Sequence, residues 1–313
     1  MAEEFGNEKA PKGAHGSGEV GHVSVLLKEA IDFLAIRRGG TYIDATLGLG
    51  GHSLEIASRL GPQGHLIGFD KDTHAIELAQ QRLSGVGGDN RPKISLLHSS
   101  YAELPQHVPP ASADGLLADL GVSSLQFGDA ARGFSFQAEG PLDMRMDPQG
   151  ERTADQVVNR MREEDLANVI YEFGEERRSR RIARAIVRAR PIRTTAHLAQ
   201  VISAALRSMK YGAHERIHPA TTTFQAIRIF VNRELEDLQA LMDAAPDVLK
   251  KGGRLVVISF HSLEDRIVKD ALRDGAKAGI FEVLTKKPLT ATREEIDRNP
   301  RSRSAKMRVA ERK

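Results

Sequence analysis

The stretch that decides the fold is Asp44-Ala45-Thr46-Leu47-Gly48-Leu49-Gly50-Gly51-His52-Ser53. It overlaps a short run typical of a β-strand, Thr41–Leu47, and leads into a helical pattern over His52–Leu60. Glycines between a strand and a helix let the backbone approach a ligand closely, and the helix N-terminus presents unpaired N–H groups. Asp70 ends the next apolar run, Gly64–Asp70, where a carboxylate can accept hydrogen bonds from ribose hydroxyls. The loop therefore predicts a nucleoside-binding site.

Two ligands and one structural alternative fit this loop. A dinucleotide fingerprint needs a third glycine where this chain has Ser53. In addition, the Asp44 carboxylate would lie beside a pyrophosphate of the same charge, which is unfavourable. S-adenosylmethionine carries a sulfonium and an ammonium group and no phosphate, so a nearby carboxylate stabilises it. We therefore predict S-adenosylmethionine as the cofactor, with a purely structural tight turn as the alternative.

Apolar runs and helical patterns alternate on both sides of the loop. Helices are predicted from near Gly21 to about Ile36, over Thr73–Leu83 and over Thr222–Leu241. Near-continuous apolar strands separated by helices predict a parallel sheet covered on both faces, which is the α/β class. The further strand candidates, the last two as a hairpin pair, are Lys93–His98, Ala113–Leu120, Arg254–Phe260, Phe281–Lys287 and Ser304–Glu311.

The strand pattern stops after about residue 128. Residues 150–213 form helical patterns rich in Arg, Glu and Ala, without a convincing strand. We therefore predict a flexible tail over residues 1–20, an α/β domain made of residues 21–128 and 216–313, and a helical insertion over residues 129–215.

Composition excludes several classes of protein. The 313 residues contain no cysteine, which rules out disulfides, cysteine–zinc sites, iron–sulfur clusters and a cysteine nucleophile. No apolar run reaches about 18–20 residues and no signal-peptide pattern opens the chain, so we expect a cytoplasmic protein without membrane spans. The chain has 45 Lys and Arg residues and 42 Asp and Glu residues, so its net charge is only +3. Whether it binds nucleic acid must therefore be judged from how the charges are distributed. We also predict no metal site, because no ligand cluster has convincing spacing.

Five motifs follow one another along the rest of the chain. They are Asp119-Leu120-Gly121-Val122-Ser123-Ser124, Gly133-Phe134-Ser135-Phe136, Pro141-Leu142-Asp143-Met144-Arg145-Met146, His218-Pro219-Ala220-Thr221 and Ser259-Phe260-His261-Ser262-Leu263-Glu264-Asp265-Arg266. Together with the glycine loop they resemble the RsmH family, also called MraW, from about His22 to Arg312.

The resemblance implies both a fold and an activity. The implied fold is a class I S-adenosylmethionine-dependent methyltransferase, Rossmann-like with a seven-stranded sheet, that carries an inserted all-helical domain for RNA recognition. The implied reaction is N4-methylation of one cytidine in the decoding region of 16S ribosomal RNA, with the assembled small subunit as the expected partner.

The resemblance also implies cofactor contacts at seven positions and shows three departures. Tyr101 replaces a common Phe and keeps a flat face for adenine, Leu125 replaces a common Pro, and Thr222 replaces a common Arg, so we assign no RNA contact to Thr222. The implied contacts are Gly50, Gly51, His52, Asp70, Tyr101, Asp119 and Gln126.

The absence of cysteine closes the usual route to carbon-5 methylation of a pyrimidine, which uses a cysteine nucleophile, whereas methylation of an exocyclic amine needs no covalent intermediate. An amine needs its lone pair freed from the ring and its developing positive charge stabilised. Asp119 is the candidate for this role, with orientation of the cofactor as the alternative. His261, at the predicted end of a strand, is a candidate proton relay or a structural residue.

Two sets of residues are candidates for contact with RNA. Phe134 and Phe136 either stack on a base turned out of its helix or pack between the domains. On a helix, Arg177, Arg181, Arg184 and Arg188 share one face, which suits phosphate contacts or else forms a solvated face paired with acidic residues. We predict Arg181, Arg184 and Arg188 as substrate-binding residues, and the basic segment Asn299–Lys306 as a second candidate.

Other functions stay open at this point. A DNA or adenine amino-methyltransferase usually carries an Asp/Asn-Pro-Pro-aromatic motif, where this chain has Asp119-Leu120-Gly121-Val122. A non-catalytic RNA-binding assembly factor would use the cofactor only as a structural ligand. The oligomeric state does not follow from the sequence.

Overall fold

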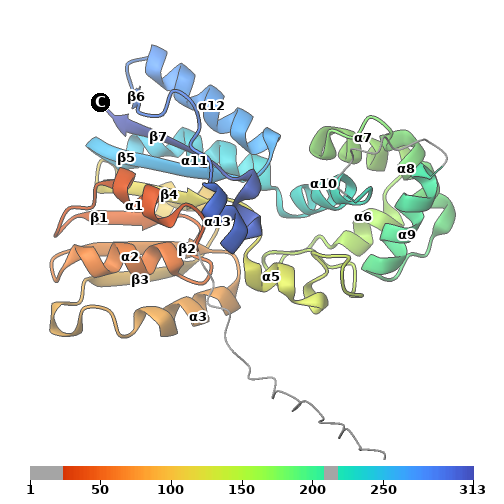
Figure 1. Ribbon diagram of the computed structural model, residues 1–313, viewed down its shortest axis with the longest axis horizontal. Helices are drawn as coiled ribbons and strands as arrows, with labels where there is room; N and C mark the ends of the chain where they lie inside the picture. Colours follow the sequence, from red (N-terminus) through yellow and green to blue (C-terminus); the bar gives the residue numbers. More distant parts are fainter. Residues whose placement is uncertain (1–23, 208–217) are drawn as a thin grey trace, which may run out of the picture.

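The computed structural model describes residues 24–207 and 218–313, so the predicted tail over residues 1–20 lies outside the described residues. Seven strands form one sheet in the order β3-β2-β1-β4-β5-β7-β6 (Figure 1). Strands β1 to β5 run parallel, and β7 runs antiparallel to both β5 and β6. The bounds are β1 Thr41–Asp44, β2 His65–Asp70, β3 Lys93–His98, β4 Ala113–Asp119, β5 Leu249–Ser259, β6 Phe281–Val283 and β7 Lys306–Arg312.

The sheet confirms the predicted α/β class and all seven predicted strands. The last two strands pair as the predicted hairpin, and β7 enters the sheet between β5 and β6. Two strands are shorter than predicted, since β1 ends at Asp44 and β6 ends at Val283. The residues after β1 turn toward the glycine loop, although the backbone N–H of Leu47 still bonds to Phe69 of β2.

Two layers of helices cover the sheet because buried side chains alternate along the strands. Tyr42 of β1 and Val256 of β5 belong to one apolar core, while their neighbours Ile43 and Val257 belong to the other. The first core contains α1 Leu27–Leu34, α2 Gly51–Leu60 and α3 Thr73–Leu83. The second contains α4 Leu104–His107, α11 Glu234–Val248 and α12 Ser262–Lys277.

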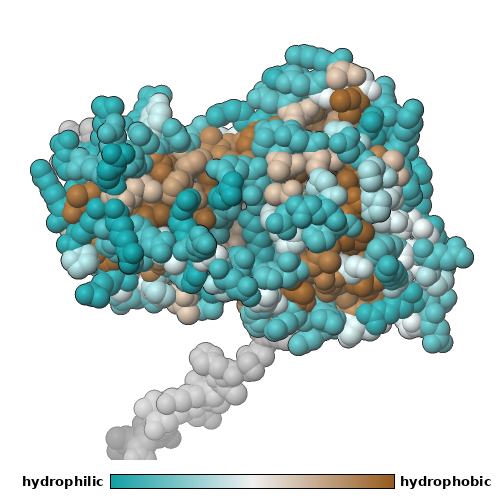
Figure 2. Space-filling model, turned by 180° about the vertical axis from the view of Figure 1, so that it is seen from behind, coloured by the Kyte–Doolittle hydropathy of each residue, from teal (hydrophilic) through white to brown (hydrophobic). Residues whose placement is uncertain are grey.

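A third apolar core belongs to a separate group of helices, which lies beyond the carboxyl ends of the parallel strands (Figure 1). The space-filling view shows this group and the sheet part as two adjoining bodies with largely hydrophilic surfaces (Figure 2). The helices of the third core are α6 Ala154–Arg160, α7 Glu163–Gly174, α8 Ser179–Ala189, α9 Thr195–Leu206 and α10 Thr221–Asn232. Because α10 packs in this core, we place the domain boundary near Arg233 rather than at the expected residue 216.

The single helix predicted over Thr222–Leu241 is wrong, because α10 and α11 are separated at Arg233. Arg233 adopts a left-handed conformation with φ 55°. The preceding Asn232 bonds through its side chain to the carbonyl of Met144 at 2.8 Å and to the N–H of Met146 at 2.6 Å. These tertiary contacts hold the turn, and no glycine or proline marks it in the sequence.

Two short helices lie near the carboxyl edge of the sheet, α5 Ser124–Gly128 and α13 Arg293–Arg298 (Figure 1). The first helix begins at Leu27, later than predicted, because Leu26 has a left-handed conformation with φ 50°.

Within residues 24–207 and 218–313, no helix is both long and apolar enough to cross a membrane.

Candidate functional site

A cavity of about 580 Å³ lies where β1, β2, β4 and β5 end, on the side of the sheet that faces the third core. This volume lies within the usual range for small-molecule sites, and the carboxyl edge of an open α/β sheet is their usual position. Its wall contains six of the seven predicted cofactor contacts: Gly51, His52, Asp70, Tyr101, Asp119 and Gln126.

Gly50, the seventh predicted contact, forms the turn behind the cavity wall. Its left-handed φ of 73° lets the chain enter α2, which begins at Gly51. A Cβ atom on Gly51 would lie 1.9 Å from the Ser24 Oγ atom. Glycine at position 51 accommodates the close approach of Ser24, before α1, which the loop pattern alone does not indicate.

Two carboxylates organise the glycine loop from opposite sides. Asp70 accepts hydrogen bonds from the N–H groups of Gly48 and Asp72, both at 2.8 Å. Asp44 accepts bonds from the Ser53 hydroxyl at 2.7 Å and the Thr46 N–H at 3.2 Å. Burial raises the pKa of Asp44 to about 6, and likewise that of Asp70. Asp44 is buried and does not line the cavity, and its charge acts on the cavity through Asp119, whose pKa it raises.

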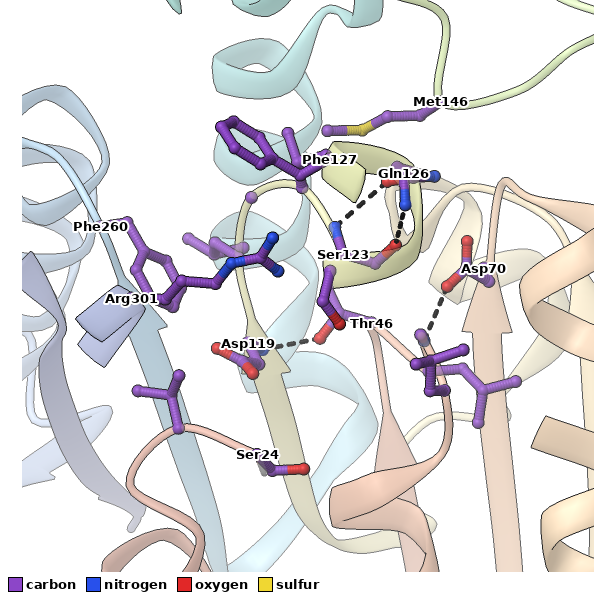
Figure 3. A pocket seen from close by; sticks show the side chains of 18 of the residues that line it. Ser24, Thr46, Asp70, Asp119, Ser123, Gln126, Phe127, Met146, Phe260 and Arg301 are labelled. Atoms are coloured by element: carbon purple, nitrogen blue, oxygen red, sulfur yellow. Dashed lines mark hydrogen bonds between the residues drawn. The ribbon is translucent and has the colours of Figure 1, made fainter. Parts of the chain in front are cut away.

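Asp119 ends β4 and projects into the cavity, as Figure 3 shows. Its backbone N–H donates to the Thr46 hydroxyl at 2.6 Å, and its Oδ2 lies 3.7 Å from Nδ1 of His52. Its Oδ1 is buried and has no hydrogen-bond partner among the described residues. Burial, followed by the negative charges of Asp44 and Glu264, raises the pKa of Asp119 well above its usual value. This carboxylate is the group in the cavity that most needs a cationic or donating ligand.

Tyr101 and Gln126 line the cavity in different ways. Tyr101 opens a 3₁₀ turn after β3, and its flat ring packs beside the apolar core behind the sheet. Gln126 is buried, its amide nitrogen donates to Asp72 at 2.9 Å, and its amide oxygen accepts from the Ser123 N–H at 3.2 Å (Figure 3). Its side chain therefore holds the start of α5 as part of a capping box.

His261 lies beside the cavity without lining it. It caps α12, and its Nε2 lies 3.2 Å from a carboxylate oxygen of buried Glu264. Glu264 and Glu234 do line the cavity, and Glu234 is held by two 2.8 Å bonds from the Arg228 guanidinium. Oxygen and nitrogen atoms of Glu234, His261 and Glu264 lie within 4.8 Å of one another, a spacing open to a metal ion. Arg228 supplies positive charge to this cluster through its ion pair with Glu234.

The two phenylalanines that line the cavity are not the two that were predicted to stack on a base. Phe134 and Phe136 both pack in the third core, and Phe136 contacts the His218 ring at 4.6 Å between centroids. Neither of them lines the cavity, whereas Phe127 of α5 and Phe260 at the end of β5 do. Base stacking needs an exposed ring face, whereas these two rings pack inside the helical group.

The predicted arginine face of α8 is exposed to solvent and lies away from the cavity. Arg181, Arg184 and Arg188 are exposed, while Ile182 and Ile186 of the same helix are buried. Arg184 forms an ion pair at 3.3 Å with exposed Glu163. The structure therefore brings these arginines together on one face but does not join them to the cofactor contacts.

The cavity is also closed by segments from the two ends of the described chain, which sequence reasoning missed. Ser24 and Val25 lie on one side, and Arg298, Arg301 and Ser304 cover another. We call residues 293–304, which comprise α13 and the following 3₁₀ turn, the strap. The strap is tied to the start of α1 by the Leu26 N–H, which donates to Glu295 at 2.7 Å. Basic residues predicted as an RNA contact thus lie at the mouth of the cavity.

Comparisons with known proteins agree with this arrangement. A family model described as the MraW methylase family matches residues 19–313. A relative from Koribacter versatilis named ribosomal RNA small subunit methyltransferase H is 69% identical, covering 98% of this chain and 99% of the relative. A relative of the same name from Acidobacterium capsulatum is 64% identical over 93% of this chain and 98% of its own. One from Synechococcus elongatus is 50% identical over 93% and 94%.

Proposed function

The chain belongs to the MraW methylase family, and from that premise we propose that it transfers the methyl group of S-adenosylmethionine to N4 of a cytidine in 16S ribosomal RNA. The names of its relatives support ribosomal RNA of the small subunit as the substrate. The observation that carries the chemistry is the buried, unpartnered Oδ1 of Asp119 at the carboxyl edge of the sheet.

The residues around the cavity fit S-adenosylmethionine. Asp70 stands where ribose hydroxyls are bound in this fold, and its pKa of about 6 leaves it ionised at neutral pH. Tyr101 offers a flat, apolar face to adenine. Asp119 Oδ1 has no partner in the described part of the chain, and a sulfonium or ammonium group beside it would favour the ionised carboxylate. When bound, the cofactor supplies an electrophilic methyl group.

Asp119 also has the geometry to act on the incoming amine. An amino group that donates a hydrogen bond to Oδ1 is pulled toward tetrahedral geometry, which frees its lone pair for attack. The carboxylate then stabilises the positive charge that forms on nitrogen. The Thr46 hydroxyl holds the backbone of Asp119, and His52 lies beside the carboxylate, which supports a fixed position for Asp119 before binding.

His261 is less well placed to accept the released proton. Its ring nitrogens face the backbone N–H and the carboxylate of Glu264, and the ring does not reach the cavity wall. We therefore propose that His261 positions Glu264 and the start of α12, and that the proton leaves through solvent at the cavity mouth.

We place the RNA across the exposed arginine face of α8 and the strap, with the cytidine reaching into the cavity between them. Arginines on one helix face suit a phosphate backbone because each presents several donors. In an assembled small subunit in the cytoplasm, one folded RNA could contact the arginine face of α8 and the strap at the same time.

The test is mass spectrometry of 16S RNA from cells that lack the protein, complemented with the wild type or with Asp119→Ala. The wild type restores one methyl group on one cytidine, and Asp119→Ala does not. Loss of an adenine methyl group would instead indicate an adenine methyltransferase. Restoration of cytidine methylation by Asp119→Ala would remove Asp119 from the chemistry.

A further inference from the structure

An aromatic ring and an arginine meet at the rim of the cavity. Phe127 is 40% exposed, and it is one of two large exposed hydrophobic side chains in the described part of the chain, with Tyr171. The Arg301 guanidinium lies 5.2 Å from the centre of the Phe127 ring, and both residues line the cavity. Figure 3 shows the Arg301 guanidinium on the Phe127 side of the cavity, above Asp119. The Phe127 face therefore already accepts a flat group.

Two polar atoms inside the same rim lack partners. Among the described residues, five buried side-chain atoms have no hydrogen-bond partner, and only those of Asp119 and Ser124 line the cavity. Buried polar atoms without a partner are rare in native proteins and need an explanation. Asp119 Oδ1 can only accept when ionised, while the Ser124 hydroxyl can donate. Both residues belong to the segment that leads from β4 into α5.

The two groups are complementary in hydrogen-bonding type to one edge of cytosine. Cytosine presents an amino donor beside a ring nitrogen and a carbonyl oxygen that accept hydrogen bonds. The amino group pairs with Asp119 Oδ1, and an adjacent acceptor pairs with the Ser124 hydroxyl. Uracil has a carbonyl oxygen where cytosine has the amino group. That oxygen would face the Asp119 carboxylate, and because both groups accept hydrogen bonds the contact is unfavourable.

We propose that Phe127 and Arg301 form the subsite for the target base, which stacks on Phe127 under the Arg301 guanidinium while Ser124 reads its edge. This inference rests on the proposed function and extends it to residues that bind the base. Entry of the base requires the guanidinium to withdraw from Phe127. The long, unbranched arginine side chain permits that movement while it keeps a planar group over the base.

The test compares full-length variants on small subunits or 16S RNA that lack the methyl group. Phe127→Ala removes the stacking face, and stacking of one base on an aromatic side chain predicts a loss of about 5- to 150-fold in kcat/KM for RNA. Phe127→Tyr keeps the face and retains activity. Tyr171→Ala, an exposed aromatic residue on α7 outside the cavity, is the matched control and leaves kcat/KM unchanged.

Two further variants test whether Phe127 and Arg301 bind the base or instead only cover the cofactor. Arg301→Ala and Ser124→Ala each lower kcat/KM for RNA, while calorimetry gives a wild-type Kd for S-adenosylmethionine. A fluorescent cytidine analogue at the target position is quenched on binding to the wild type and not on binding to Phe127→Ala.

Unchanged kcat/KM in Phe127→Ala and Arg301→Ala, with cytidine methylation intact, would overturn the subsite and leave the proposed function standing. An equal loss of S-adenosylmethionine affinity would also overturn it, because the pair would then cover the cofactor. Absence of any cytidine methylation by the wild type would refute the proposed function itself.

Discussion

Replacing Asp119 with asparagine should abolish the pH dependence of S-adenosylmethionine binding above neutral pH, where Asp70 is already ionised. In the free protein, burial and the charges of Asp44 and Glu264 hold the pKa of Asp119 well above its usual value. A cationic ligand favours the ionised carboxylate, so the pKa of Asp119 is lower in the complex. Binding therefore releases a proton between the two pKa values. Affinity rises with pH through that interval, by up to a factor of about ten per pH unit, and becomes constant above the free-state pKa.

The size of the effect follows from the separation of charges. Two opposite charges about 4 Å apart attract by about 4 kcal/mol at an effective dielectric constant of about 20. Part of this attraction is used to remove the proton from Asp119. We therefore expect Asp119→Asn to weaken binding by about 1–3 kcal/mol above neutral pH, which is about 5- to 150-fold.

Calorimetry in two buffers of different ionisation enthalpy measures both the affinity and the protons released. The wild type should release a proton and Asp119→Asn should not. Asp44→Asn is the second test, since Asp44 lies outside the cavity wall but its charge helps raise the pKa of Asp119. This variant should keep the proton release and shift it to lower pH. If Asp119→Asn kept the wild-type pH slope, another group would be titrating and our assignment of the cation site would be refuted.

Three other changes test separate parts of the structure. Gly51→Ala should weaken S-adenosylmethionine binding by about 1–3 kcal/mol because its methyl group meets the Ser24 hydroxyl, and adding Ser24→Ala should recover part of that loss in calorimetry. Arg228→Met should lower the free energy of unfolding by about 3–5 kcal/mol in urea titrations, because it leaves the Glu234 charge buried without a partner. Adding Glu234→Met should restore most of that stability. If the losses from the two single variants simply added, the pairing would be contradicted. Arg188→Gln should reduce the salt slope of RNA binding by about 0.7–0.9, and an unchanged slope would remove α8 from the interface.

The fold could be predicted from sequence to a large extent because its strands are buried on both faces. Runs such as His65–Asp70 are continuously apolar apart from their ends, and the glycine loop marks the first strand-to-helix turn. The carboxyl ends of parallel strands meet at one edge, so Asp70 and Asp119 could be placed together before the structure was known. Local pattern and chain topology were sufficient for that part of the site.

The missed features depend on tertiary contacts that leave no local pattern. The break at Arg233 is held by the side chain of Asn232, which reaches Met144 and Met146 far along the sequence. Phe134 and Phe127 are both aromatic residues near the end of β4, and only packing decides that the first is buried and the second lines the cavity. Sequence spacing does not contain that information.

The position of the strap and β7 imposes an order on when the enzyme can work. Arg301 closes the cavity and β7 sits inside the sheet, yet both are made after every other part of the site. While those residues are still in the exit tunnel of a translating ribosome, the cavity has no outer wall and β5 has an unpaired edge. We therefore expect a nascent chain to stay inactive until residues 293–313 have left the tunnel, because only then can the strap cover the cavity and β7 pair with β5.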